Sequence, residues 1–137
     1  MNIQLNPEMT IHEVQQQFSA LFPYLKIDFY TMPHDEGGSV WSKYQIFDEQ
    51  KKLRDISPLS ETKTYEITDT TTTGAFEQDL HQHFGLFVQV FRRSMDIWLA
   101  TTATDKWALV YQNKVGESSA HSVTQMVYET RSLDEMD

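Results

Sequence analysis

Two arginines and two tryptophans between residues 84 and 107 are the side chains best suited to recognise a partner. Arg92 and Arg93 are the only adjacent arginine pair, and Trp98 and Trp107 are two of the chain's three tryptophans. A guanidinium group binds carboxylates and stacks on aromatic rings, and tryptophan is enriched at interaction hot spots. If one of the arginines shares a face with Trp98, we expect a binding surface there.

The same four residues also fit a hairpin with no binding role. Arg92 and Arg93 follow a predicted strand directly, so their side chains point to opposite faces and only one can join a given site. Asp96 is close enough in sequence to form an ion pair with either arginine. Exposed ion pairs add little stability, and large aromatic side chains are usually buried. We favour this structural interpretation, with Trp98 and Trp107 covered by a loop or by the tail.

A second group with chemical potential contains Asp79 and His83, which are four residues apart. On a helix this spacing places both side chains on one face, where they can form an acid–base pair or supply two metal ligands. His81 lies on a different face from His83. Such a pair, with Arg92, could serve a pocket between sheet and helices. An ordinary contact on a helix surface is the better explanation of the pair, and we favour it.

Two further features suggest ligands only weakly. His34, Asp35 and Glu36 share a loop where oxygen ligation of a divalent ion is conceivable but has no fixed spacing. Threonines 70–73 precede a helix, whose N-terminus attracts anions, although helix capping alone explains them. The chain lacks the signatures of hydrolases, zinc proteases, dinucleotide-binding proteins and EF-hands. We therefore expect no metal and no cofactor. Catalysis is disfavoured but stays open.

The first third of the chain predicts a helix followed by strands. Thr10 with Glu13 three residues later forms a capping box, and apolar residues recur at helical spacing until Pro23 ends the helix. Residues 25–30 alternate between apolar and polar, which is typical of a half-buried strand. Residues 40–47 are predicted as a second strand. The polar residues after them predict a short helix or a turn.

The middle of the chain predicts a strand, a helix and a hairpin. The strand surrounds residues 65–67, because aromatic and β-branched side chains fit a pleated surface. Apolar residues then repeat every four positions over 76–84, and Gly85 suits the left-handed end of a helix. Residues 86–100 contain two alternating runs on either side of the polar sequence RRSMD. This pattern indicates two antiparallel strands joined by a short polar loop.

The segment from Thr104 to Val115 fits either a helix or a strand. Thr104 as N-cap and Gly116 as terminator favour a helix, whereas the apolar run at 107–111 alone would suit a strand. We predict the helix. Residues 117–137 carry five acids and one arginine, and we expect them to form an acidic, flexible tail after one globular domain at 1–116.

These elements together predict an α+β fold. A chain of 137 residues has the size of one compact domain. Interspersed helices and strands with a hairpin favour a largely antiparallel sheet with helices packed on one face, in a single-domain, two-layer sandwich.

Composition narrows the function class. A net charge of -9 opposes direct binding to nucleic acid or to an anionic membrane. The absence of cysteine, of a long apolar run and of a signal peptide favours a cytoplasmic protein. We expect a protein-interaction or structural module that uses the aromatic hairpin and its acidic character, with a basic protein or a second copy as partner. The alternative is a small-molecule-binding domain or enzyme.

Overall fold

The computed structural model describes residues 1–33 and 42–120. Two short helices and five strands have these bounds: β1 (Asn2–Leu5), α1 (Ile11–Leu21), β2 (Leu25–Tyr30), β3 (Lys63–Glu66), α2 (Thr73–Phe84), β4 (Phe87–Ser94) and β5 (Ile97–Ala100). A third helix covers 109–120. Single 3₁₀ turns lie at Ser42–Tyr44, Leu53–Asp55 and Thr102–Thr104. No helix in the described ranges is long and apolar enough to cross a membrane.

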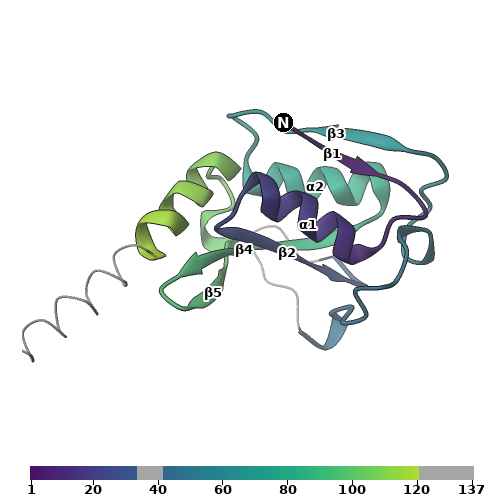
Figure 1. The fold of residues 1–137 in the computed structure, drawn as a ribbon, viewed down its shortest axis with the longest axis horizontal. Coiled ribbons are helices and arrows are strands. Elements are labelled where there is room, and N and C mark those ends of the chain that lie inside the picture. The colour runs from purple at the N-terminus through teal and green to yellow at the C-terminus, as the bar shows by residue number, and fades with distance from the viewer. Residues whose placement is uncertain (34–41, 121–137) are drawn as a thin grey trace, which may run out of the picture.

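The predicted α+β architecture is confirmed, with the strands divided between two antiparallel sheets. One sheet has the order β2-β4-β5, and the other is the two-stranded ribbon β1-β3. Figure 1 shows α1 and α2 between the ribbon and the larger sheet. The helices therefore cover one face of the β2-β4-β5 sheet, and the ribbon covers their other side. β1 was not predicted, because its pairing with β3 joins residues some sixty positions apart.

Helix α1 begins and ends where its sequence predicts. The Thr10 hydroxyl accepts the Glu13 N–H at 3.2 Å and donates to the Glu13 carboxylate, so the threonine caps the first turn. The helix ends at Leu21, two residues before Pro23. Its buried stripe enters the core, and the members of that stripe are Ile11, Val14 and Phe18.

Helix α2 follows the threonine-rich segment and ends at Gly85. The Thr72 hydroxyl caps it by accepting the Ala75 N–H at 3.1 Å. Gly85 has φ 64°, a left-handed conformation that glycine adopts without a steric cost. Phe76 and Leu80 are buried, and Phe76 stacks on Phe18 of α1 with ring centroids 5.1 Å apart. The two helices thus share one core.

The central strands alternate as predicted. On β2 the buried residues that face the helices are Leu25, Ile27 and Phe29, and opposite them on β4 lie Val88 and Val90. Because side chains alternate between faces, the residues between them define the outer face of the sheet. Arg92, two residues after Val90, shares the inner face, whereas Arg93 shares the outer one.

The prediction of a strand at 40–47 is wrong over its described part. Residues Ser42–Tyr44 form a 3₁₀ turn, and Gln45 makes only an isolated bridge with Tyr30. The alternating pattern places Ile46 against the core, but the chain passes the edge of β2 with only two backbone bonds, from Thr31 N–H to Tyr44 and from Ile46 N–H to Phe29. Val40 and Trp41 lie outside the described residues.

The predicted helix near the C-terminus is confirmed but begins later. Residues 109–120 are helical, whereas Thr104 belongs to a 3₁₀ turn and does not cap the helix. The intervening residues form a turn whose end is bonded to the threonine segment: Ala108 makes an isolated bridge with Thr72, the Thr73 N–H donates to the Trp107 carbonyl, and the Leu109 N–H donates to the Thr71 carbonyl. These bonds delay the helix to residue 109.

Gly116 lies inside this helix, so the prediction that it ends the helix is wrong. A Cβ atom at this position would lie 2.9 Å from Tyr24 Cβ, 3.1 Å from the Tyr24 carbonyl oxygen and 3.2 Å from Arg92 Cγ. Glycine therefore allows the helix to approach the end of the larger sheet closely. Residues 117–120 continue the helix, and the remainder of the predicted tail, 121–137, lies outside the described residues.

Candidate interaction surface and neighbouring pocket

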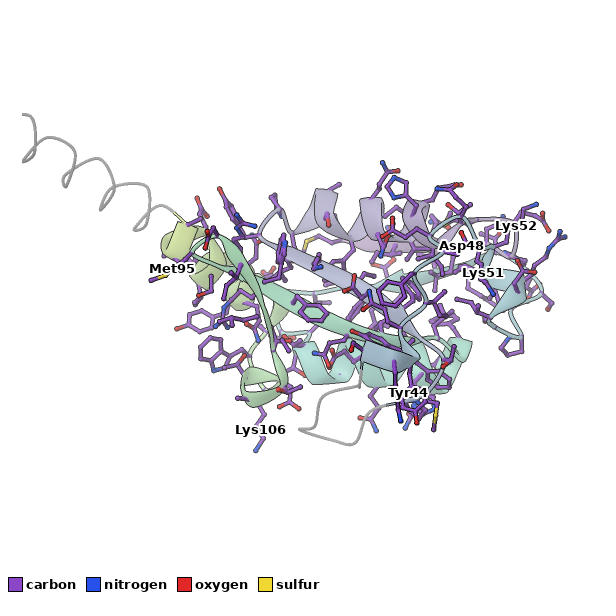
Figure 2. All side chains as sticks on the ribbon, turned by 90° about the horizontal axis from the view of Figure 1, so that it is seen from below. Tyr44, Asp48, Lys51, Lys52, Met95 and Lys106 are labelled. Carbon is purple, nitrogen blue, oxygen red and sulfur yellow. The ribbon has the colours of Figure 1, made fainter. Side chains whose placement is uncertain are left out.

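The β4–β5 hairpin is longer and tighter than predicted. Strand β4 extends through Arg92 and Arg93 to Ser94, and only Met95 and Asp96 form the turn. Met95 has φ 57°, a left-handed conformation that costs a residue with a side chain about 1–2 kcal/mol. Its side chain is exposed at one end of the molecule, opposite the end that carries Lys51 and Lys52 (Figure 2).

The outer face of the hairpin brings Trp98 together with two cations. Arg93 is opposite Trp98 in the ladder, and its guanidinium carbon lies 5.4 Å from the indole centroid. Lys26 Nζ lies 5.5 Å from the centroid of the same indole and 5.1 Å from the centroid of the Phe91 ring. The same atom lies 3.5 Å from a carboxylate oxygen of Asp28. Trp98 is 36% exposed. Arg93, rather than Arg92, therefore shares a face with Trp98, and Trp98 is not fully covered.

The inner face gives Arg92 a different role. Its Nη1 donates to Gln112 Oε1 at 2.7 Å, and its guanidinium carbon lies 5.3 Å from the centroid of Trp107. Gln112 is fully buried, and its amide nitrogen donates to the Thr104 carbonyl at 2.7 Å. Burial lowers the pKa of Arg92. This arginine fixes the helix at 109–120 to the hairpin, and the two arginines do not share a site.

Charge on the hairpin is close to balanced. The predicted ion pair between Asp96 and an arginine is absent among the described residues; Arg93 Nε donates instead to the Met95 carbonyl at 3.1 Å. Lys26 forms an ion pair with Asp28 at 3.5 Å, and Asp96 lies in the hairpin turn, three residues after Arg93. The acidity of the whole chain is therefore not concentrated on this surface.

The backbone of β5 has one open edge. The Arg93 N–H donates to Tyr24 on the β2 side, so alternate residues of β4, Arg92 and Ser94, turn their backbone groups towards β5. Their ladder partners Leu99 and Ile97 turn towards β4. The N–H and C=O groups of Trp98 and Ala100 therefore point away from the sheet. Within the described residues no strand pairs with this edge.

Exposed apolar side chains concentrate around the same edge. Nine large apolar side chains are exposed in the described residues, and six of them lie on the hairpin or at the start of the last helix: Met95, Ile97, Trp98, Leu99, Val110 and Tyr111. Trp107 connects the two groups, because its ring lies 5.0 Å from Tyr111 and contacts Arg92, the ladder partner of Leu99. Trp107 is itself half-buried.

Asp79 and His83 lie on one face of α2, as their spacing predicts, but 4.0 Å apart and exposed. Asp79 accepts a hydrogen bond of 2.6 Å from the Tyr65 hydroxyl. The pKa of Tyr65 is raised mainly by burial and further by this hydrogen bond. Asp79 therefore connects α2 to β3. The pockets beside α2 and α1 are lined by other residues of the described ranges, so the structure does not bring Asp79, His83 and Arg92 together in either of them.

A pocket with a volume of about 390 Å³ lies on the opposite side of α2. Glu77 and His81, also four residues apart, line it together with Phe87 and Val88 of β4. Glu77 is 6% exposed, and its Oε2 accepts the Val90 N–H at 2.8 Å. This acid–histidine pair was missed. Glu77 and His81 have the same spacing as Asp79 and His83. The two pairs differ only in that the side of α2 that carries Glu77 and His81 faces β4.

The weaker ligand predictions find no support in the described ranges. No group of three or more potential metal-ligating side chains occurs there, and His34, Asp35 and Glu36 lie outside them. At the N-terminus of α2, the amides of Thr73, Gly74 and Ala75 donate to Trp107, Asp105 and Thr72 respectively. The threonine segment therefore caps the helix and leaves these amides occupied.

Comparison of the chain with protein-family models, with curated proteins and with solved structures finds no match. The functional conclusion therefore rests on the geometry of this chain alone.

Proposed function

We propose that the chain is a protein-interaction module that binds its partner by strand addition to β5. The observation that carries the proposal is the open edge of β5, where two outward-facing backbone positions, Trp98 and Ala100, adjoin exposed apolar side chains. An extended segment that adds to a sheet edge gains main-chain hydrogen bonds, and the flanking side chains supply specificity. Trp98 on one face and Leu99 on the other are suited to that second role.

The sequence of β5 lacks the devices that usually protect an edge strand. Natural edges are blunted by lysine, by proline, by bulges or by a covering element. Residues 97–100 read IWLA, with neither a charge nor a proline, and the ladder to β4 is regular through all four residues. The four residues are all exposed. An apolar, regular and uncovered edge strand fits a role in binding a partner better than permanent exposure to water.

The backbone of Ala100 offers a test that spares the hairpin. Ala100→Pro removes an outward N–H without removing a ladder bond to β4, whereas the control Ala100→Ser keeps the N–H and the small side chain. With each variant as bait in an extract of the host, we expect the serine variant to retain the bound proteins of the natural chain and the proline variant to lose them. Equal capture by both variants would contradict strand addition.

A small-molecule site is the second candidate, supported by the pocket beside α2. Its wall combines a buried carboxylate, Glu77, with the apolar side chains of Phe87 and Val88. Lys106 also lines the pocket, although its side chain projects away from the body of the protein (Figure 2). Native mass spectrometry of the gently recovered protein is the test. The variant Ala75→Trp fills the pocket. A bound mass that is present in the native chain and absent from this variant supports this function, whereas a native chain without added mass contradicts it.

A further inference from the structure

We propose that the partner at β5 is a second copy of the same chain, paired antiparallel about a two-fold axis that passes beside Leu99. This inference rests on the proposed strand addition and adds the identity of the partner. In a symmetric dimer the same patch must complement itself, so the geometry of one strand is sufficient to test the idea.

The outward backbone groups fix the register. In an antiparallel pair, residues that exchange hydrogen bonds alternate with residues that do not. Trp98 and Ala100 carry the outward groups, and Leu99 between them faces β4. If Trp98 of one copy is opposite Ala100 of the other, both outward positions of both copies are used. Leu99 then meets Leu99 of the second copy at the axis, in a non-hydrogen-bonded pair.

The side chains suit this register. On the outer face the large indole of Trp98 would lie opposite the methyl group of Ala100 in the second copy, so that bulk faces a small side chain. On the inner face two Leu99 side chains, each 38% exposed, would cover one another. Ile97 would lie opposite Thr101. No like charges oppose each other, and aromatic and aliphatic cross-strand pairs stabilise a ladder.

The neighbouring surface extends the contact beyond one strand. Leu99 is the ladder partner of Arg92, which contacts Trp107, and Trp107 contacts the exposed Tyr111. The helix at 109–120 therefore adds apolar surface on the inner face of the sheet, the face that carries Leu99. Lys26 is paired with Asp28, and Arg93 and Asp96 add one charge of each sign to the hairpin, so the local net charge is small, although each chain carries a net charge of -9.

Single cysteines test the register directly, because the chain has none of its own. At a non-hydrogen-bonded pair the Cα atoms lie about 4.5 Å apart, within the range of about 4.4–6.8 Å that a disulfide spans. Leu99→Cys should therefore cross-link two copies. Ile97→Cys is the matched control: it lies on the same strand and face, but its two copies would be about 13 Å apart at about 3.3 Å per residue.

The experiment oxidises each variant at the same concentration and follows the covalent dimer on a non-reducing gel. We expect Leu99→Cys to cross-link at least about tenfold faster than Ile97→Cys, and the added Ala100→Pro change to abolish the difference. Equal rates would overturn self-pairing. Faster cross-linking of Trp98→Cys than of Leu99→Cys would overturn the register. If self-pairing fails while Ala100→Pro still abolishes capture of other proteins, strand addition stands and only the identity of the partner is wrong.

Discussion

Arg93 and Trp98 lie opposite each other in the β4–β5 ladder, with the guanidinium carbon 5.4 Å from the indole centroid on the outer face of the sheet. The adjacent Arg92 points the other way and binds Gln112 and Trp107. The hairpin thus separates two tasks: its inner face holds the last helix, and its outer face and edge are exposed.

Trp98→Ala should leave the fold intact and weaken the interaction. Trp98 is 36% exposed, and the side chains that contact its indole include the flexible cation of Lys26. We therefore expect Trp98→Ala to lower the free energy of unfolding by less than about 1 kcal/mol. Phe29→Ala, at a buried position of the same sheet, should cost about 3–5 kcal/mol. Urea unfolding measures both changes. A large destabilisation by Trp98→Ala would place the indole in the core and refute the interaction surface.

The two adjacent arginines should respond differently to the same substitution. Arg92→Met leaves the buried Gln112 Oε1 without its donor, so we expect a loss of about 1–3 kcal/mol of unfolding free energy. Arg93→Met removes an exposed cation–π contact worth about 0.5–1 kcal/mol. Denaturant unfolding of the two variants side by side is the measurement. Equal costs would show that the faces are not distinct.

Gly116→Ala should destabilise the protein although alanine favours helices. The helix preference gains up to about 1 kcal/mol, but the new methyl group would lie 2.9 Å from Tyr24 Cβ and 3.1 Å from a backbone oxygen. Overpacking of this kind costs about 1–3 kcal/mol, and backbone atoms yield little. Thermal unfolding should show a net loss relative to Glu117→Ala, a change at an exposed position of the same helix. A gain in stability would contradict the close packing of this helix.

Stability should fall at high pH in part through Tyr30. Burial, with the charges of Asp28 and Glu77, raises the pKa of Tyr30 to about 12, against about 10 in an unfolded chain. The folded state therefore favours the protonated phenol. Its contribution is fully present below about pH 10 and is lost as the pH rises through about 12. Tyr30→Phe should flatten the decline in unfolding free energy between about pH 9 and pH 12. The same slope in both proteins would contradict the raised pKa.

Local signals in the sequence predicted most elements correctly. The cap at Thr10, the alternation of residues 25–30 and the left-handed Gly85 each depend on neighbours within a few residues, and the structure confirms all three. Features that depend on distant partners were missed or misplaced. Strand β1 exists because β3 pairs with it, and the last helix starts late because its preceding residues bond to the threonine segment.

The sequence predicted which residues belong to the candidate site but not how they are arranged. Opposite orientations of Arg92 and Arg93 follow from their adjacency in a strand, but the sequence does not show which of them joins Trp98. The polar sequence RRSMD was assigned to the loop, whereas its first three residues belong to β4 and only Met95 and Asp96 form the turn. Glu77 and His81 carry the same spacing as Asp79 and His83, and the orientation of α2 alone distinguishes them.

The most direct test of self-pairing through β5 is the mass of the native chain, of Ala100→Pro and of Ala100→Ser by sedimentation equilibrium over a range of concentrations. We expect the native chain and the serine variant to approach twice 16.0 kDa with rising concentration, whereas the proline variant stays at 16.0 kDa. A native chain that keeps the mass of the proline variant at every concentration would contradict self-association through β5.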